Sequence, residues 1–362
     1  MTPMPNGNVP GRWETITTLC RLAGAWLNGS DPRCPHSESA WQPLIEAASH
    51  HLVTPAIAYG LRHSSGLPST VEEYFQAVLF LNRDRNRVIM ETLTGALQEL
   101  NKAGIVPVLL KGAASIAGAL YPDSAMRILG DLDVLVPQDQ ARNAARVLSA
   151  IGYETVDKGT VRYSEHHHLA PLRHIETGVF IELHTQPVLQ ELKSFLDAET
   201  MIAKAVRAPF TQCSAFLPAP THRIIHAIVH DQLSDGNYAR RRLNIRQLLE
   251  LAALANRHAN DIDWEQVGKA FDANGQRHVL EDGVEVAEAL FEVPLGTGLS
   301  RSGRQPLLGL KAEIERSDLH WLLRRFAAAT RERPQLFLRV LQQDAWARLG
   351  KALRRELRSE RW

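Results

Sequence analysis

The sequence predicts an α+β fold, in which a small mixed β-sheet core is flanked by N-terminal and C-terminal helical lobes. Three observations predict it. Apolar residues recur at three- and four-residue spacing in both end regions, which is typical of amphipathic helices. Around Gly104 the spacing changes to short runs of apolar and β-branched residues. These runs then alternate with helical segments up to about residue 190, and the alternation indicates a sheet with helices packed on it.

The N-terminal lobe is expected to span residues 1–90, although helical spacing continues from about Trp13 to Leu100. Turn-forming residues separate the helical segments from one another. The segments read ETITTLCRLAGAWL, AWQPLIEAASHHL and VEEYFQAVLFLNRDRNRVIMETLTGALQEL. From about Gln190 the helical pattern returns and continues to the end of the chain. Residues 191–362 are therefore expected to form the C-terminal helical lobe.

The sheet-containing core is expected over residues 91–190. Its first strand is IVPVLL, which ends at Lys111-Gly112, and AASIAGALY comes next as a short helix. DLDVLVP is the second strand, ended by Pro137, and DQARNAARVLSAIG is an amphipathic helix that stops at Gly152. YETVD and VFIELH have strand character, and VRYSEHHHL is a further candidate strand.

The composition is that of an ordinary soluble protein. The 362 residues are 44% hydrophobic and 22% charged, a length that indicates two or three lobes. The net charge of +1 gives no overall field that favours nucleic acid or a membrane as partner. No signal-peptide pattern and no apolar run of membrane-spanning length occurs, so we expect a cytoplasmic protein without membrane association. Its three scattered cysteines indicate reduced thiols, not disulfides or a zinc site: Cys20, Cys34 and Cys213.

Three acidic side chains in two strands form the most informative pattern. Side chains alternate along a strand, so Asp131 and Asp133 share one face, and we expect them at the exposed end of the strand. Glu182 lies between Ile181 and Leu183 in a later apolar strand. Neighbouring carboxylates repel each other unless a cation lies between them, and Mg²⁺ prefers oxygen ligands. The pattern therefore predicts a site for two metal ions, suited to in-line displacement at phosphorus.

Residues upstream of the acidic pair are suited to phosphate. Lys111-Gly112 ends a strand and opens a helix, where unpaired N–H groups are available and Gly112 permits close approach. Lys111 and Arg127 are the cations best placed to neutralise triphosphate oxygens. The order of these residues along the chain, with a third acid in a later strand, favours a site that binds a nucleoside triphosphate and its metal ions.

This combination resembles the DNA-polymerase-β-like nucleotidyltransferase superfamily, with its strand, glycine loop, helix, acidic pair and later third acid. More narrowly, the chain resembles an uncharacterised bacterial nucleotidyltransferase family with a KG…R…DLDhLV…hElH pattern. The resemblance covers most of the chain and implies that Asp131, Asp133 and Glu182 are the catalytic metal ligands. Gly112 occupies the position of the phosphate-loop glycine, and the ElH pattern includes His184.

The resemblance implies a nucleotidyltransferase core that uses Mg²⁺ or Mn²⁺ and an NTP donor, with ATP expected. The loop departs from the superfamily at Ala113, where Gly or Ser is usual, and Ser115 or Lys111 is expected to compensate. The donor-binding residues are then expected to be Lys111, Gly112, Ser115, Arg127 and His184. The acceptor is expected to be a small molecule, peptide or protein, or a tRNA end, with long nucleic acid disfavoured by the near-neutral charge.

Two further histidine groups have alternative interpretations. His226 and His230 share one helix face, a spacing that can bind zinc, but residue 227 is Ala and a metalloprotease motif is absent. We expect this face to pack on the core or close the nucleotide cleft. The run His166, His167 and His168 is expected on an exposed strand or at the rim of the active site.

Two other functions remain open from the sequence. Phosphoryl transfer could use the same ligands, since they do not decide which phosphorus is attacked. A catalytically silent, nucleotide-binding regulatory module is the other alternative, and Ala113 is the feature that favours it. The sequence does not indicate the oligomeric state.

Overall fold

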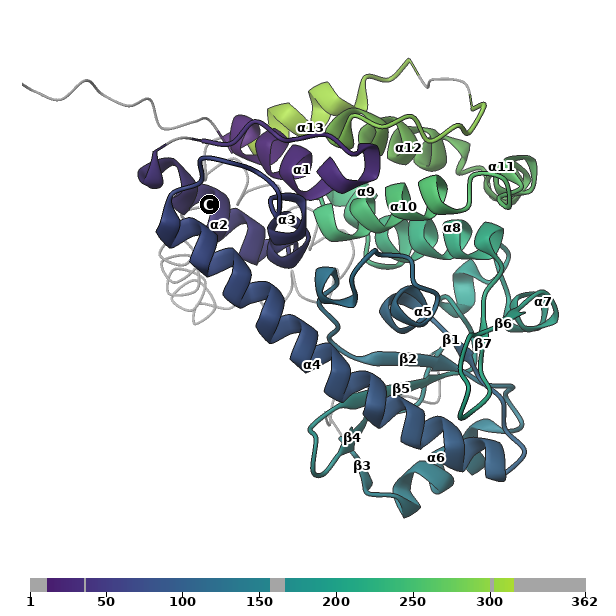
Figure 1. The fold of residues 1–362 in the computed structure, drawn as a ribbon. Coiled ribbons are helices and arrows are strands. Elements are labelled where there is room, and N and C mark those ends of the chain that lie inside the picture. Colours follow the sequence, from purple (N-terminus) through teal and green to yellow (C-terminus); the bar gives the residue numbers. More distant parts are fainter. Residues whose placement is uncertain (1–11, 36, 157–166, 300–302, 316–362) are drawn as a thin grey trace, which may run out of the picture.

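The computed structural model describes residues 12–35, 37–156, 167–299 and 303–315. Within these ranges the chain forms one mixed sheet with helices on both sides (Figure 1). The helices before the sheet are α1 Arg12–Asn28, α2 Trp41–His50, α3 Thr54–Gly60 and α4 Ser69–Lys102, with a short 3-10 helix η1 at Glu38–Ala40. The helices within and after the sheet are α5 Lys111–Ala117, η2 Ser124–Met126, α6 Ala141–Ala150, η4 Gln190–Leu192, α7 Ala198–Ala203, α8 Pro220–Ile228, η5 Val229–Ser234, α9 Asn237–Arg240, α10 Ile245–Arg257, α11 Trp264–Ala273, α12 Arg277–Phe291 and α13 Pro306–Ile314.

The sheet has seven strands in the order β3-β4-β5-β2-β1-β7-β6. Its strands are β1 Val108–Leu109, β2 Leu132–Leu135, β3 Tyr153–Thr155, β4 Leu172–His174, β5 Phe180–His184, β6 Val206–Arg207 and β7 Phe216–Leu217. The pairs β2–β5 and β1–β7 are parallel, and the other neighbouring pairs are antiparallel. The predicted α+β fold with a mixed sheet is confirmed.

The expected helical run from Gln190 onward is wrong over a short stretch. β6 and β7 lie in it and add two strands to the sheet beside β1. Each has only two residues, too few for an alternating pattern to show in the sequence. The candidate strand VRYSEHHHL lies mostly outside the described residues, and its last part contributes an isolated bridge between His168 and His184.

The helices on either side of the sheet in sequence pack together in space. A single hydrophobic core contains Leu19 of α1, Ile57 of α3, Leu249 of α10 and Phe291 of α12. A Cβ atom added at Gly24 of α1 would lie 2.8 Å from the ring of Phe291, so this glycine permits the close contact of α1 with α12. The two helical lobes therefore form one body on the same side of the sheet (Figure 1).

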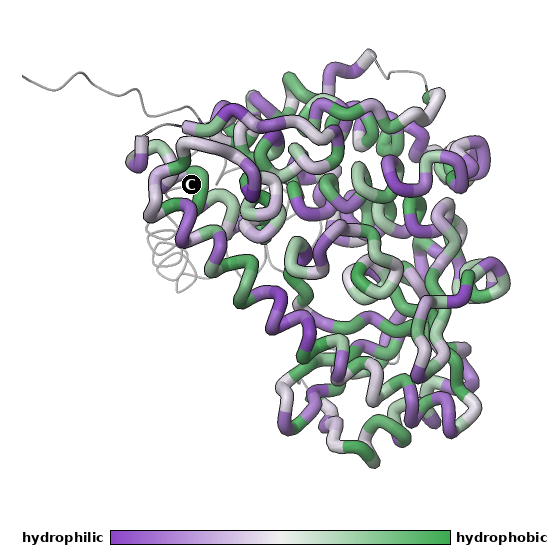
Figure 2. Tube along the Cα trace, in the orientation of Figure 1, coloured by the Kyte–Doolittle hydropathy of each residue, from purple (hydrophilic) through white to green (hydrophobic). Residues whose placement is uncertain are grey.

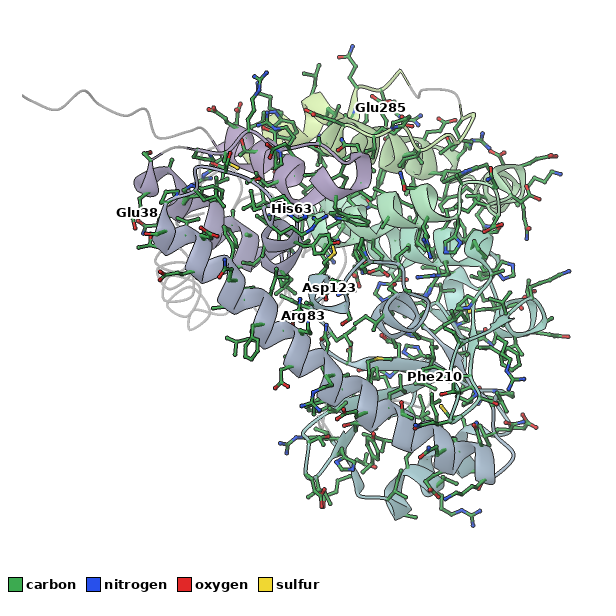
Figure 3. The ribbon with its side chains drawn as sticks, viewed as in Figure 1. Glu38, His63, Arg83, Asp123, Phe210 and Glu285 are labelled. Atoms are coloured by element: carbon green, nitrogen blue, oxygen red, sulfur yellow. The ribbon has the colours of Figure 1, made fainter. Side chains whose placement is uncertain are left out.

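Helix α4 connects this helical body to the sheet. It is 34 residues long, and hydrophobic and hydrophilic residues alternate along it, as in an amphipathic helix (Figure 2). Its first half contributes Phe75 to the helical core, whereas Leu93 and Leu97 of its second half pack on the sheet. Midway, Arg83 forms a 2.6 Å ion pair with Asp123 just before η2, and both residues are labelled in Figure 3.

None of the helices in the described ranges has the length and apolar character needed to cross a membrane.

Candidate functional site

Two neighbouring parallel strands place the acidic side chains side by side. In the register of β2 and β5, Asp133 pairs with Glu182. Leu132 and Val134 point into the core formed with α4 and α6, so the pleat turns Asp133 to the opposite face of the sheet. The apolar alternation of β2 thus fixes which face carries the acidic residues.

Asp133 is buried, which corrects the expectation of an exposed strand end. Its side chain is only 3% exposed, whereas Asp131, two residues earlier, is exposed at the surface. The two carboxylates differ in solvent access because Asp131 precedes β2, whereas Asp133 lies inside it, where β5 pairs from Leu132 onward. Lys111 and His184 also contact the Asp133 side chain.

One oxygen of Asp133 receives two hydrogen bonds. Lys111 Nζ donates to Asp133 Oδ1 at 2.7 Å, and His184 Nε2 lies 2.8 Å from the same atom. Burial raises the pKa of Asp133, but the Lys111 charge and the bond from His184 outweigh it and hold the pKa far below the usual range. Asp133 is therefore ionised, and His184 must carry its proton on Nε2. Burial is also the main cause that lowers the pKa of His184, so its ring is neutral at neutral pH.

The acidic cluster has the donor atoms for a cation. In the described part of the chain, ligand atoms of Asp133, Glu182 and His184 all lie within 4.8 Å of one another. Asp131 is not within that distance but interacts with the same charges. The surrounding protein raises the pKa of Asp131, and the negative charges of Asp133 and Glu182 raise it further. This repulsion among carboxylates is what a bound cation would relieve.

Lys111 has a backbone conformation that an L-residue rarely adopts. It is the first residue of α5, and its φ is +45°, in the left-handed region. A non-glycine residue there costs about 1–2 kcal/mol. The Lys111 side chain nevertheless reaches the acidic cluster, where burial lowers its pKa but Asp133, Asp131 and Glu182 more than compensate, so the net shift is upward. Backbone strain at a residue in contact with the candidate site is a common feature of functional sites.

Gly112 is required for packing. A Cβ atom there would lie 2.7 Å from Leu129 Cδ2 and 3.5 Å from Arg127 Nη2. A side chain at this position would therefore collide with Leu129, whereas its contact with the guanidinium of Arg127 would be an ordinary one.

Ser115 and Arg127 are bound to a residue that the sequence interpretation missed. Ser115 Oγ donates to Glu250 Oε1 at 2.7 Å, and Arg127 Nε donates to Glu250 Oε2 at 2.8 Å. Glu250 lies in α10 and is buried, as are Ser115 and Arg127. The network ties α5 and the segment before β2 to the C-terminal helices. A lone acid inside the apolar stretch LLELAALA was the signal that could have identified it.

Histidines surround the pair formed by Lys111 and Asp133. The rings of His167 and His168 each lie 5.2 Å from the ring of His184, centroid to centroid, and His166 lies outside the described residues. His226 of α8 and His230 of η5 have ring centroids 6.0 Å apart, and both interact electrostatically with Lys111, Asp133 and His184.

His226 and His230 are neutral side chains inside the protein. Burial lowers the pKa of His226 to about 3 and that of His230 well below its ordinary value, and Lys111 adds to both shifts. His226 Nε2 is buried without a hydrogen-bond partner among the described residues. The π-helical turn η5 comes directly after α8, and such turns occur frequently at functional sites. The sequence predicts that this face packs on the core or closes the nucleotide cleft; His226 is buried in the protein, and closure of a cleft stays a prediction.

A separate cavity of about 620 Å³ lies among η5, α9, α12 and α13. Tyr238, Asp282 and Arg304 are among its lining residues, and none of the three acidic residues of the cluster lines it.

The chain matches the model of a known protein family and is similar to a solved structure. Residues 37–292 match the model of a family described as uncharacterised nucleotidyltransferase. The chain is also similar to the crystal structure of an antigenic nucleotidyltransferase-like protein from Paracoccidioides brasiliensis. The identity is 14%, the match covers 57% of this chain and 97% of that one, and the TM-score is 0.34. Among curated proteins, none matches.

Proposed function

Because this chain belongs to a family of uncharacterised nucleotidyltransferases, we propose that it transfers a nucleoside monophosphate group from an NTP to a hydroxyl-type acceptor. The supporting observation is the register pairing of Asp133 with Glu182 on adjacent parallel strands. Asp131 interacts electrostatically with both of these carboxylates. In the reaction, the acceptor oxygen attacks the α-phosphorus, the bond from that phosphorus to the bridging oxygen breaks, and pyrophosphate leaves.

The proposed metal ligands are Asp131, Asp133 and Glu182. Their mutual repulsion fits a divalent cation, and their oxygen atoms suit Mg²⁺. Carboxylate oxygens also suit Mn²⁺, which makes it a suitable alternative. When bound, divalent cations would neutralise the phosphate oxygens and lower the pKa of the acceptor hydroxyl.

The chain's own residues then have distinct proposed roles. Lys111 and His184 keep Asp133 ionised and fixed in position through its Oδ1 atom. Asp131 is exposed, so of the three proposed ligands it is the one that solvent reaches, and the acceptor's proton would pass to that solvent. Lys111 also supplies positive charge for the phosphates.

Gly112, Ser115 and Arg127 are proposed to serve donor binding through α5. Gly112 permits the close packing of α5 against Leu129, and Glu250 accepts hydrogen bonds from both Ser115 and Arg127. These contacts hold α5 in place, and because Lys111 is the first residue of α5 they position its side chain beside the acidic cluster.

We propose ATP as the donor and a small molecule, peptide or protein as the acceptor. The net charge of +1 over 362 residues argues against a long nucleic acid, which strongly basic surfaces usually bind. A cytoplasmic location is proposed because the three cysteines are free thiols.

Calorimetric titration of each of the four NTPs, with Mg²⁺ and with EDTA, tests the proposal. The variant is Asp131→Asn, because Asp131 is exposed and its replacement should leave the fold intact. Asp139→Asn is the matched control, since Asp139 is also exposed but lies beyond β2. We expect Mg²⁺-dependent binding of at least one NTP to the wild type and the control, and at least tenfold weaker binding to Asp131→Asn.

Product analysis with an NTP labelled at the α-phosphate then separates the two transfer reactions. Slow transfer to water should release NMP and pyrophosphate if the proposal is correct, whereas NDP and phosphate would indicate phosphoryl transfer. Failure of folded wild type to bind any NTP would refute the proposed function.

A further inference from the structure

Three arginines surround a single carboxylate beside the acidic cluster. This arginine group consists of Arg127 and Arg223, which are buried, and Arg246, which is partly buried. Arg127 Nε donates to Glu250, and Arg223 Nη2 donates to the hydroxyl of Ser115 at 3.0 Å. Buried guanidinium groups normally need a negative partner each, because removing a charge from water is costly.

Glu250 cannot neutralise the whole group. Its Oε1 atom accepts from Ser115 Oγ and its Oε2 atom accepts from Arg127 Nε, so both oxygens are engaged. Within the described residues, neither Arg223 nor Arg246 forms an ion pair with any carboxylate. Glu250 is therefore the one carboxylate that the arginine group contacts directly among the described residues, and Arg223 and Arg246 have no carboxylate partner of their own there.

Arg246 is the member of the group best placed to meet a ligand. It is the second residue of α10, one helical turn before Glu250 and hence on the same helix face. Its side chain makes no hydrogen bond with any residue that the structure describes. Burial lowers its pKa and Arg127 lowers it further, whereas the negative charges of Glu250 and Asp131 act in the opposite direction. Its charge thus lies within electrostatic range of Asp131, the exposed end of the acidic cluster.

We propose that Arg246 binds the β- and γ-phosphates of the NTP donor, and the same pyrophosphate group after transfer. The inference rests on the proposed nucleotidyltransferase function and adds a phosphate-binding residue from the helices that follow the sheet. A polyphosphate supplies acceptor oxygens for the guanidinium of Arg246, which makes no hydrogen bond with a described residue. The planar fork of an arginine matches phosphate oxygens with two parallel hydrogen bonds.

The test measures inorganic tripolyphosphate and ATP binding by calorimetry, with Mn²⁺ present. Wild type is compared with Arg246→Gln and with Arg257→Gln, a matched control at the exposed end of the same helix. We expect Arg246→Gln to weaken tripolyphosphate binding at least tenfold, the loss typical of a charge-assisted hydrogen bond. Arg257→Gln should bind within about twofold of wild type. Mn²⁺ binding without phosphate, measured by water proton relaxation, should be unchanged in both variants.

Thermal melting separates a binding role from a structural one. Removing Arg246 relieves its repulsion with Arg127, so Arg246→Gln should melt no lower than wild type. A clearly lower melting temperature with unchanged tripolyphosphate affinity would make Arg246 a structural residue and overturn the inference. Should Arg246→Gln fail to fold, Arg246→Met keeps the apolar stem and takes its place in the same comparison.

The two proposals fail in different ways. Wild type that does not bind tripolyphosphate overturns the role of Arg246, even if ATP binds through its base and sugar. Loss of tripolyphosphate binding in Arg246→Gln supports that role even if no nucleotide is ever transferred. Only the NTP titrations with Asp131→Asn and the product analysis decide the nucleotidyltransferase proposal itself.

Discussion

Lys111 Nζ lies 2.7 Å from Asp133 Oδ1, although the two residues are 22 positions apart in the chain. The pair joins the first residue of α5 to the middle of β2, and Asp133 is almost fully buried. A buried carboxylate that is held ionised by a lysine is ready to bind a cation without first losing a proton. The pair therefore links the stability of the core to the chemistry proposed for it.

Asp133→Asn is expected to remove metal-dependent transfer and to destabilise the fold. The amide leaves the partly buried Lys111 charge without its partner, at a cost of roughly 2–4 kcal/mol. Urea unfolding without metal measures this cost, and Asp139→Asn is the exposed control. Wild-type stability together with wild-type activity in Asp133→Asn would contradict both the buried ion pair and the site assignment.

The left-handed backbone at Lys111 predicts an unusual order of stability for two variants. Lys111→Ala and Lys111→Gly both remove the ammonium group, so they differ only in how they tolerate a φ of +45°. We expect the glycine variant to be more stable by about 1 kcal/mol, the reverse of the usual order in helices. Chemical denaturation of the two variants side by side measures the difference. Lower stability of the glycine variant would show that the backbone at this position is unstrained.

Arg127 and Glu250 are expected to be strongly coupled in a double-mutant cycle. Each single change, Arg127→Met or Glu250→Gln, leaves the other buried charge unpaired, and the double variant avoids that cost. We expect a coupling energy of about 2–3 kcal/mol in urea unfolding at pH 7. Additive effects would mean that the two charges are stabilised by other groups.

The same pair predicts how the coupling depends on pH. Burial raises the pKa of Glu250, but Arg127 and the bond from Ser115 outweigh it, so the net shift is downward. A lowered carboxyl pKa gives stability that is present above the unfolded-state value, about 4.3, and is lost as the pH falls through the lower folded value. The coupling energy should accordingly shrink in acid, provided the proteins remain folded there.

Asp231 is expected to have the opposite pH dependence. Burial raises its pKa to about 6, although Asn237, Asn244 and Gln232 donate hydrogen bonds to it. Between the unfolded value near 3.9 and this folded value the native state binds the extra proton, so the contribution of Asp231 to stability falls as pH rises.

The variant Asp231→Asn measures this contribution. Relative to wild type, its free energy of unfolding should rise by about 2 kcal/mol between pH 4 and pH 7, since it lacks the titrating group. Asp139→Asn, at an exposed position, should behave closely like the wild type. A constant difference between Asp231→Asn and wild type across this range would refute the raised pKa.

Much of the core could be predicted because local patterns determine it. The alternation around Leu132, Asp133 and Val134 shows which residues of β2 face the core. Glu182 was recognisable as a lone acid in an apolar strand, and the register of two parallel strands then brought it beside Asp133.

The features that could not be predicted depend on contacts between distant segments. The burial of Asp133 depends on Lys111 and His184, which come from other elements, and the partnership of Glu250 with Arg127 spans 123 residues. In the sequence Arg246 follows three arginines, a cluster that could reach phosphates or RNA but more commonly marks the start of a solvated helix. Only the contacts of Glu250 in α10 with Ser115 of α5 and with Arg127 place this helix start near the acidic cluster.

The place of β7 in the sheet limits how the protein can be divided. β7 pairs with β1 through Val108 and Phe216, and it is the neighbour that prevents β1 from being an edge strand. A fragment that stops near residue 190 would leave the N–H and C=O groups of β1 open to other chains, the arrangement that leads proteins to aggregate edge to edge. A fragment that begins at residue 91 would also cut through α4, whose second half covers the sheet. A fragment that keeps the whole sheet and all of α4 therefore has to begin before Ser69 and continue past Leu217.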